Sequence, residues 1–220
     1  MSAVLAILWK DLVSEWRSRD RLVAMLLFSL LVVVVFHFAL PLHGGGPPEG
    51  LPGLLWIAYV FAAILGLNRA FAVELENEAL SGLALVPCDR GFVFLGKAAA
   101  SFLLILVAQL ATAVAFGLAF DAPLGRVGGR LAGVAALGAA GLASVGTLFA
   151  AIAVRTRYRE VMLPLLLLPL LVPLLLGAVR ATSALLASER VPFDAIQLLL
   201  VTDAVFLIVS FVGFEYVLDE

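Results

Sequence analysis

Six long apolar blocks dominate this chain of 220 residues, separated by short connections that contain charged residues, glycine or proline. Each block is close to the length of about 20 residues that an α-helix needs to cross the hydrocarbon core of a bilayer. Main-chain polar groups find no water in that core, so the blocks are expected to be helical. They cover residues 22–42, 54–72, 98–120, 131–154, 161–179 and 195–218. The sequence therefore predicts an all-α integral membrane protein with six transmembrane helices.

The overall composition agrees with a membrane protein and argues against several functional classes. Hydrophobic residues make up 64% of the chain and charged residues 14%, whereas soluble domains are about half apolar and about a quarter charged. One cysteine and two histidines are too few for an internal disulfide or an unaided zinc site. We expect no catalytic residue, no cofactor of the chain's own, no metal site and no nucleic-acid partner.

Residues 1–21 precede the expected membrane domain of residues 22–220 and have the pattern of an amphipathic helix. Apolar side chains recur at steps of three and four residues, and charged side chains occupy the remaining positions. The apolar stripe consists of Leu5, Leu8, Trp9, Leu12 and Trp16. Two tryptophans beside basic residues are typical of a helix that lies in the membrane surface. The alternative is a cytosolic segment that packs on a partner protein.

Basic and aromatic residues predict how the chain sits in the membrane. With a cytoplasmic N-terminus, ten of the 14 lysines and arginines fall in cytoplasmic segments and four fall outside. Because cytoplasmic connections are enriched in these residues, we expect both termini to lie in the cytoplasm. Trp56, Tyr59 and Tyr216 are expected in the aromatic belts at the two membrane surfaces.

The fourth and fifth blocks have unusual compositions for membrane helices. Small residues recur every four positions in the fourth block, a pattern that allows close helix packing. They are Ala132, Ala136, Ala140 and Ser144. The fifth block contains Pro164, Pro169 and Pro173, and each proline removes a backbone donor. The fifth helix is therefore expected to be kinked or locally unwound.

Asp203 is a carboxylate placed well inside the sixth block. A charge at the bilayer centre costs about 2.5–3.5 kcal/mol on insertion scales, so this side chain should face the bundle interior or be protonated. It is either a transport or proton-relay residue or a hydrogen-bonded packing contact. If it acts through its charge, Asp203→Asn should impair activity but not assembly.

The longest expected cytoplasmic loop, residues 73–97, contains a candidate docking segment for a cytoplasmic partner. Three acids open the loop, leucines follow, and a proline ends the segment. These residues are Glu74, Glu76, Glu78, Leu80, Leu83, Leu85 and Pro87. Acids favour the first turn of a helix, and exposed leucines need a surface that covers them. The segment is either a solvated connector or a short helix that docks on a cytoplasmic partner.

The order of residues in this loop resembles that of ABC-2 type exporters, in which acids, a short Gly-x-Leu-x-x-Leu phrase (looser in this chain, as Gly82-Leu83-Ala84-Leu85), a proline and a lysine follow one another. Here they correspond to Glu74, Glu78, Gly82, Leu83, Leu85, Pro87 and Lys97. More narrowly, nearly the whole chain resembles the cytochrome c maturation heme exporter protein B family (CcmB). The further residues behind this resemblance are Lys10, Asp11, Leu12, Glu15, Arg17, Leu55, Trp56, Leu75, Glu76, Leu163, Pro164, Pro169 and Pro173.

The resemblance implies an ABC-2 type permease architecture with an interfacial N-terminal helix, six spans and a coupling helix between the second and third spans. A separate ABC ATPase subunit would bind the loop and hydrolyse ATP, and two permease copies would pair with two ATPases. Complexes of this family also contain a heme-handling membrane subunit and a small helper membrane protein. They load or release heme on a periplasmic chaperone, so heme is a candidate substrate of the complex rather than a cofactor of this chain.

Other classes of membrane protein compete with this interpretation. The main alternative is a stand-alone secondary transporter or channel, although such proteins usually show internal repeats and more intramembrane polar residues. An intramembrane enzyme needs a nucleophile and a base, and the chain has no Gly-x-Ser-x-Gly motif. Residues 91–98 match the start of a nucleotide-binding loop but have alanine where Ser or Thr would hold magnesium. ATP hydrolysis is therefore expected on another subunit.

Overall fold

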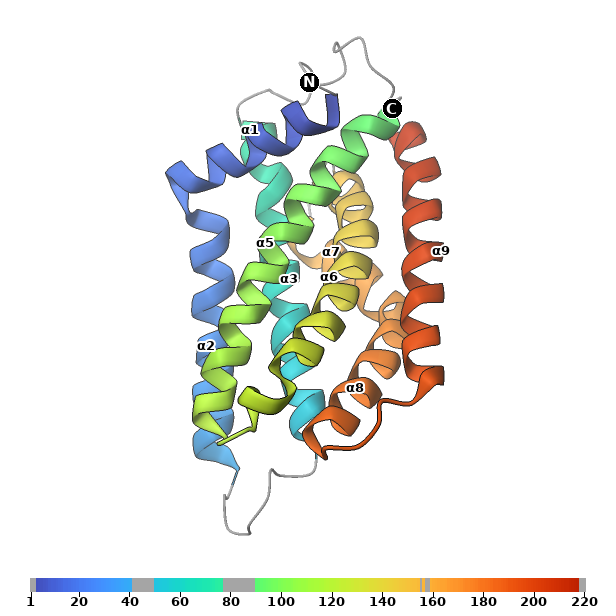
Figure 1. The fold of residues 1–220 in the computed structure, drawn as a ribbon. Coiled ribbons are helices and arrows are strands. Elements are labelled where there is room, and N and C mark those ends of the chain that lie inside the picture. Colours follow the sequence, from blue (N-terminus) through green and yellow to red (C-terminus); the bar gives the residue numbers. More distant parts are fainter. Residues whose placement is uncertain (1–2, 41–49, 77–89, 155, 157–158, 218–220) are drawn as a thin grey trace.

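Helices account for nearly all of the protein that the computed structural model describes, namely residues 3–40, 50–76, 90–154, 156 and 159–217. No β-strand occurs in these ranges. In chain order the helices are α1 (Ala3–Ser18), α2 (Asp20–Ala39), α3 (Leu51–Glu76), α5 (Arg90–Ala119), α6 (Leu124–Val154), α7 (Arg159–Leu170), α8 (Val172–Leu186) and α9 (Phe193–Val217). Figure 1 shows an upright bundle with α1 lying across one end.

Six segments of this bundle are suited to cross a membrane. α2, α3, α5, α6 and α9 are each long and apolar enough for one crossing, and α7 with α8 forms a bent pair that passes the same criteria together. Successive crossings alternate in direction, and the marked N- and C-terminal ends lie at the same end of the bundle (Figure 1). The predicted all-α membrane fold is confirmed. α5 is already helical from Arg90, earlier than the expected start of the third span near residue 98.

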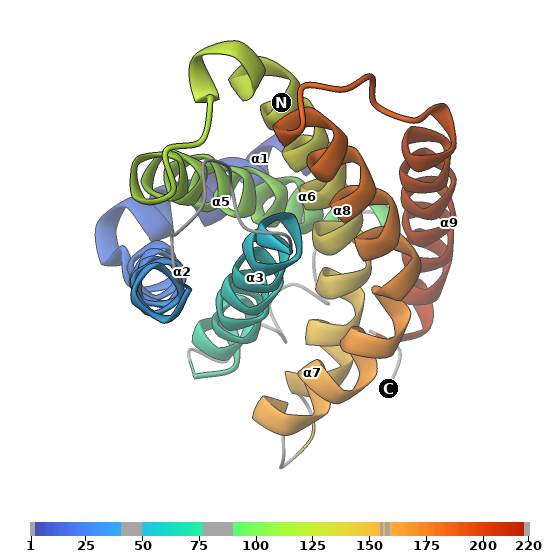
Figure 2. The ribbon, with the colours of Figure 1, turned by 90° about the horizontal axis from the view of Figure 1, so that it is seen from below.

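α6 is the central helix of the bundle. It packs against α3, α5, α7, α8 and α9, and Figure 2 shows it between the outer helices α2 and α9. A side chain at Gly138 would overlap the ring of Trp56 on α3, so the absence of one lets the two helices approach closely. Ala132, Ala136 and Ala140 are only partly buried. Trp56 therefore packs against a glycine next to the small-residue stripe rather than against its alanines.

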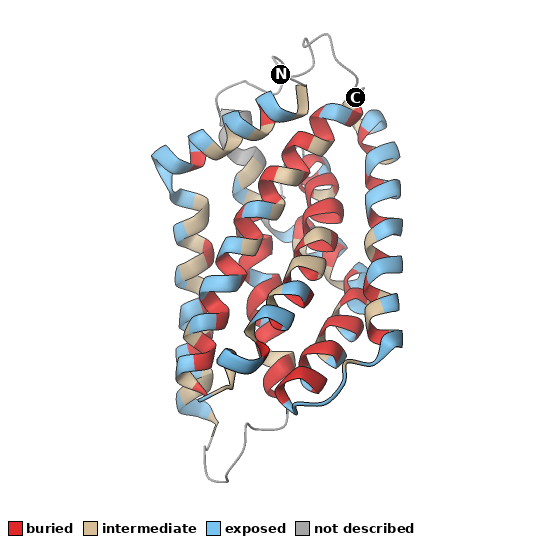
Figure 3. Cartoon of the chain, viewed as in Figure 1, coloured by how far each residue is buried: buried red, intermediate tan, exposed pale blue. Residues whose placement is uncertain are grey.

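The distribution of buried residues separates inner helices from outer ones. Buried side chains concentrate on α3, α5 and α6, whereas α2 and α9 present mostly exposed side chains (Figure 3). Those exposed side chains are largely apolar. A continuous apolar exterior of this kind fits contact with the hydrocarbon core of a bilayer.

The fifth membrane crossing is broken into two helices. α7 and α8 are bent by 63° relative to each other, and the break falls at Leu171, between Pro169 and Pro173. A proline has no backbone N–H, so Pro173 cannot donate to the carbonyl one turn earlier in the chain. The break lies within the proline-rich segment for which the sequence predicts a kink.

Two of the three aromatic residues expected in the membrane-surface belts lie in the core instead. Trp56 and Tyr59 are both fully buried, so the belt prediction is wrong for them, whereas Tyr216 is exposed. The indole Nε1 of Trp56 donates a hydrogen bond of 2.9 Å to the Thr182 hydroxyl on α8. The Trp56 and Tyr59 rings meet edge to face with centroids 5.3 Å apart. Their polar atoms suggested an interface, but a partner on a neighbouring helix allows Trp56 to be buried.

Candidate functional site

The candidate docking segment lies mostly outside the described residues. The backbone of Glu74 and Glu76 belongs to the last turns of α3. Glu78, Leu80, Leu83, Leu85 and Pro87 fall in the range 77–89, outside the described part of the chain. The two helices that flank this range, α3 and α5, reach the same end of the bundle as the N- and C-termini (Figure 1). A partner bound there would act directly on the second and third crossings.

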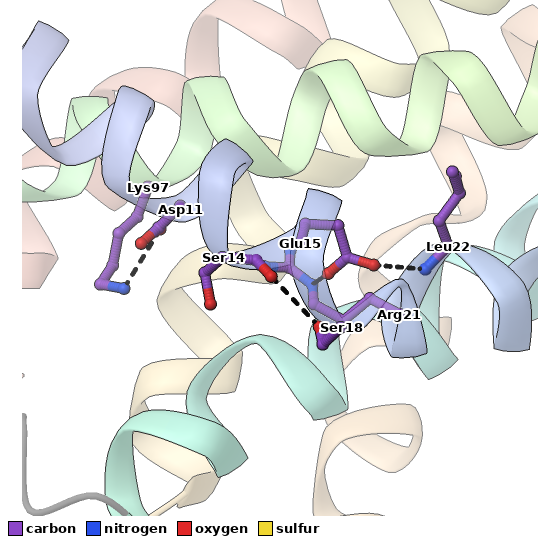
Figure 4. Close-up of polar contacts among 7 residues, drawn as sticks. All are labelled: Asp11, Ser14, Glu15, Ser18, Arg21, Leu22 and Lys97. Atoms are coloured by element: carbon purple, nitrogen blue, oxygen red, sulfur yellow. Dashed lines mark hydrogen bonds and ion pairs between the residues drawn. The ribbon is translucent and has the colours of Figure 1, made fainter.

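A buried ion pair joins α1 to α5 at this same end. The ammonium of Lys97 lies 3.5 Å from a carboxylate oxygen of Asp11, and the two side chains are only 5% and 11% exposed. The backbones are also close, because a side chain at Gly96 would come within 2.8 Å of Ile7. Figure 4 shows Lys97 and Asp11 pointing toward each other from the two helices. The pair fixes α1 against the first turns of α5.

A second acid of α1, Glu15, fixes the junction between α1 and α2. One carboxylate oxygen accepts a hydrogen bond of 2.9 Å from the backbone N–H of Leu22, and the other lies 3.7 Å from the Arg21 guanidinium (Figure 4). Arg19, between the helices, has a left-handed backbone with φ of 58°. Because Glu15 satisfies an N–H in the first turn of α2, it stabilises the sharp change of direction at Arg19. We refer to Asp11, Glu15, Arg21 and Lys97 together as the polar seam.

The opposite side of α1 is apolar and exposed. Leu5, Trp9 and Trp16 have exposed fractions of 52%, 66% and 78%. The helix therefore directs its acids toward the protein and much of its apolar stripe away from it, the reverse of an amphipathic helix in a soluble domain. This arrangement fits the predicted position in the membrane surface, where lipid would cover the exposed face.

The polar seam was not predicted from the sequence. The residue pattern placed Asp11 and Glu15 on the polar side of a surface helix and Lys97 at the end of the expected loop, and all three also entered the family resemblance. A signal was present, because residues four apart on a helix share a face and Lys97 is a cation at the beginning of an otherwise apolar block. Pairing these residues, however, requires the packing of α1 on α5, which no local pattern contains.

Asp203 lies near the middle of α9 and points into the bundle. Both of its carboxyl oxygens are buried, and neither has a hydrogen-bond partner among the described residues. A side chain at Gly141 on α6 would overlap one of these oxygens and the Leu174 side chain of α8. The carboxyl group therefore packs against bare helix backbone at the junction of α6, α8 and α9. Among the described residues, Asp203 makes a packing contact without a hydrogen bond.

The stretch that imitates a nucleotide-binding loop is part of a regular helix. Residues 91–98 all belong to α5, and Lys97 within it is buried against Asp11. A phosphate-binding loop needs exposed backbone N–H groups that converge on the nucleotide. In α5 these N–H groups lie in a regular helix and donate to its own carbonyl groups, so this stretch is not a nucleotide site.

The sequence matches one family over almost its full length. A family model described as "CcmB protein" covers residues 2–216. The chain belongs to the CcmB family. Both the polar seam and Asp203 lie inside the range that the CcmB model matches.

Several CcmB relatives carry the name heme exporter protein B. That of Paracoccus denitrificans is 31% identical over 176 residues, which cover 80% of each chain. The Rhodobacter capsulatus protein is 33% identical and covers 78% of each chain. The Escherichia coli K12 protein is 32% identical over 76% of this chain and 74% of its own length. The similarity to CcmB proteins therefore extends over most of the membrane bundle.

Proposed function

We propose that this chain is the membrane permease subunit of an ABC transporter complex for cytochrome c maturation, which exports heme or releases a heme-loaded periplasmic chaperone. The supporting observation is the CcmB family match over residues 2–216, joined by relatives named heme exporter protein B. In this proposal the chain contributes the path through the membrane and no catalytic residue. ATP is hydrolysed by a separate ABC ATPase subunit.

The segment between α3 and α5 is the proposed contact with that ATPase. α3 ends at Glu76 and α5 begins at Arg90, so a force on the intervening residues would act on two membrane crossings at once. Rigid-body movement of packed helices is a common way to convert such a force into a change of access. The proposed contact residues are Glu74, Glu76, Glu78, Leu80, Leu83, Leu85 and Pro87.

The proposed orientation places this segment and both termini in the cytoplasm of a bacterium, with the bundle in the inner membrane. Its support is the excess of basic residues in the segments at that end. The remaining proposed partners are a heme-handling membrane subunit and a small helper membrane protein, with two permease copies in each complex. Heme enters as a substrate of the complex.

Purification of the tagged chain from native membranes in mild detergent tests the proposal. We expect the chain to recover an ABC ATPase together with cytochrome maturation subunits. The triple variant Glu74→Lys, Glu76→Lys and Glu78→Lys should lose the ATPase, because reversed charge would repel a surface that suits acids. The matched control is Glu189→Lys, which changes an exposed acid in the α8–α9 connection at the opposite end of the bundle.

Two outcomes would contradict the proposal. Recovery of the chain alone, with transport retained after reconstitution, would favour a stand-alone transporter. Equal loss of the ATPase in the triple variant and in Glu189→Lys would show that the effect does not come from the proposed docking segment. Loss in the triple variant alone, with the other membrane subunits still bound, is the expected result.

A further inference from the structure

No charged residue in the described part of the chain forms an ion pair with the carboxyl group of Asp203. α9 packs against α5, α6 and α8, and the described charged residues on these four helices are Arg90, Lys97, Arg126, Arg130, Arg180, Asp194 and Glu215. Arg180 pairs with Asp194 at 3.6 Å, Arg90 donates to the Glu215 carbonyl, and Lys97 pairs with Asp11. None of them forms an ion pair with Asp203.

The two arginines on α6 are also remote from Asp203. Arg130 precedes Gly141, the α6 residue that contacts Asp203, by 11 positions. At about 1.5 Å per residue this separation is about 16 Å along the helix. Arg126 is one further turn away. An ionised Asp203 would therefore be a single buried charge in the middle of a membrane-spanning bundle.

Burying a carboxylate without a partner costs several kcal/mol. A carboxyl group in such a position avoids this cost by binding a proton. A neutral carboxylic acid avoids this penalty and can still form a hydrogen bond. We propose that Asp203 is a proton-binding site, a carboxylic acid that is neutral in the closed junction of α6, α8 and α9 and that releases its proton to water when this junction opens. This role goes beyond ATP-driven transport, which by itself requires no proton-binding residue inside the membrane domain.

The surroundings of Asp203 are suited to such an opening. Leu174, which shares the contact at Gly141, lies three residues after the break at Leu171. The two halves of the fifth crossing are separate helices with a 63° bend, so α8 can shift without carrying α7 with it. α9 has few protein contacts on its outer side. Movement of α8 or α9 away from α6 would admit water to the carboxyl group, and the reverse movement would require the proton to return.

Infrared spectroscopy of the purified protein in an ester-free detergent tests the resting state directly, because no lipid ester carbonyl then overlaps the band of a neutral carboxylic acid. A neutral carboxylic acid gives a carbonyl-stretch band separate from those of carboxylates and amides. We expect this band in the wild-type protein at neutral pH, its complete loss in Asp203→Asn, and its displacement rather than loss in Asp203→Glu. Asp194→Asn is the matched control on the same helix, because Asp194 is exposed and paired with Arg180, and its band should equal that of the wild type.

The result that would overturn the proposal is an Asp203→Asn spectrum that equals the wild-type spectrum at neutral pH. If Asp203→Asn is not recovered as a folded protein, the displacement in Asp203→Glu decides the assignment alone. Opening is tested by transfer to heavy water, where the shift of the band reports exchange of the acid proton for deuterium. This exchange should be slow at rest and at least ten times faster in a complex that is turning over ATP. An unchanged exchange rate would contradict proton release on opening. The spectrum at rest needs neither heme nor an ATPase, so its failure is distinguishable from failure of the proposed function.

Discussion

Glu15 and Asp203 are both acids that point toward the helix bundle, yet their surroundings differ completely. Glu15, at the end of the bundle, accepts a hydrogen bond from Leu22 and lies beside Arg21. Asp203, near the middle of a crossing, has two buried oxygens without a hydrogen-bond partner in the described chain. Ends of a membrane bundle supply free N–H groups and basic side chains, and its centre supplies neither. Whether an acid lies at the end of the bundle or in its centre thus decides which partners are available to its charge.

The two regions also differ in how freely their helices can move. In the polar seam, several partnered charges hold α1 in one position on α5 and α2. At the junction of α6, α8 and α9, one acid rests against bare backbone beside a helix break. A partnered buried charge resists separation because each half would be left uncompensated. We therefore expect the seam to behave as a rigid connection and the Asp203 junction as a movable one.

Removal of the seam's buried cation should have the largest effect on stability. Lys97→Ala leaves the largely buried Asp11 with only the half-exposed cation Lys10, and we expect the free energy of unfolding to fall by about 3 kcal/mol, since the buried member of the ion pair is lost. Unfolding of the detergent-solubilised protein in a denaturant titration measures this quantity. Limited proteolysis should also cleave α1 earlier than in the wild type.

The matched control for the seam is Lys10→Ala. Lys10 lies 3.0 Å from the same Asp11 carboxylate, but half of its side chain is exposed. Exposed ion pairs contribute little, so the change should stay within about 0.5 kcal/mol. If the two lysine variants lost equal stability, the burial of Lys97 would not be what makes the seam rigid.

The contact between Asp203 and α6 can be tested by adding one methyl group. Gly141→Ala would overlap the carboxyl group and Leu174, and overpacking of this kind costs about 1–3 kcal/mol. Gly133→Ala is the control on the same helix, because nothing lies within 4 Å of the added atom, and it should be neutral or slightly stabilising.

The double variant Gly141→Ala with Asp203→Ala should lose less stability than the two single variants combined, as expected for residues in contact. Strict additivity would place the two residues out of contact.

Replacement of each acid by its neutral amide should affect stability differently at Glu15 and at Asp203. Glu15→Gln keeps an oxygen for the Leu22 N–H but loses the attraction to Arg21, so we expect a loss of about 1 kcal/mol. Asp203→Asn replaces a neutral acid with a neutral amide of the same shape, and its effect on stability should stay below about 0.5 kcal/mol. Both are measured in the same denaturant titration at neutral pH. A larger loss for Asp203→Asn than for Glu15→Gln would contradict the idea that Asp203 is uncharged at rest.

The fold could be predicted from the sequence because membrane length and apolarity are local properties. Each crossing is a continuous run of residues, so the six spans could be placed without knowledge of their neighbours. Helix ends were less exact, since α5 begins at Arg90 rather than near residue 98. The added turns contain Phe92, Val93, Phe94 and Leu95 between Arg90 and Lys97. The expected loop was extended to Lys97 because a lysine commonly marks a membrane boundary, whereas this lysine lies inside the helix.

Pairings between distant residues could not be predicted in the same way. Lys97 and Asp11 are 86 positions apart, and Trp56 meets Thr182 across 126 positions. The belt prediction for Trp56 failed for this reason: an indole N–H in a membrane protein needs a partner, and the sequence alone does not say whether that partner is water or a hydroxyl on another helix. Asp203 was identified because an acid inside an apolar block is conspicuous, but the absence of its partner became apparent only in three dimensions.

The smallest effect on stability is expected on the exposed side of α1. Trp16 is 78% exposed and contacts the Arg19 guanidinium at 5.7 Å from the ring centre, so Trp16→Phe should change the free energy of unfolding in detergent by less than about 0.5 kcal/mol. In lipid the same residue should be informative, because an exposed tryptophan on an interfacial helix lies at the level of the headgroups. Lipids brominated near the headgroup should quench wild-type fluorescence more than that of Trp16→Phe, and lipids brominated at the chain ends should not distinguish them. If headgroup-brominated lipids quenched the wild type and Trp16→Phe equally, this face of α1 would lie away from the membrane, and the seam would then hold a helix that faces a protein partner.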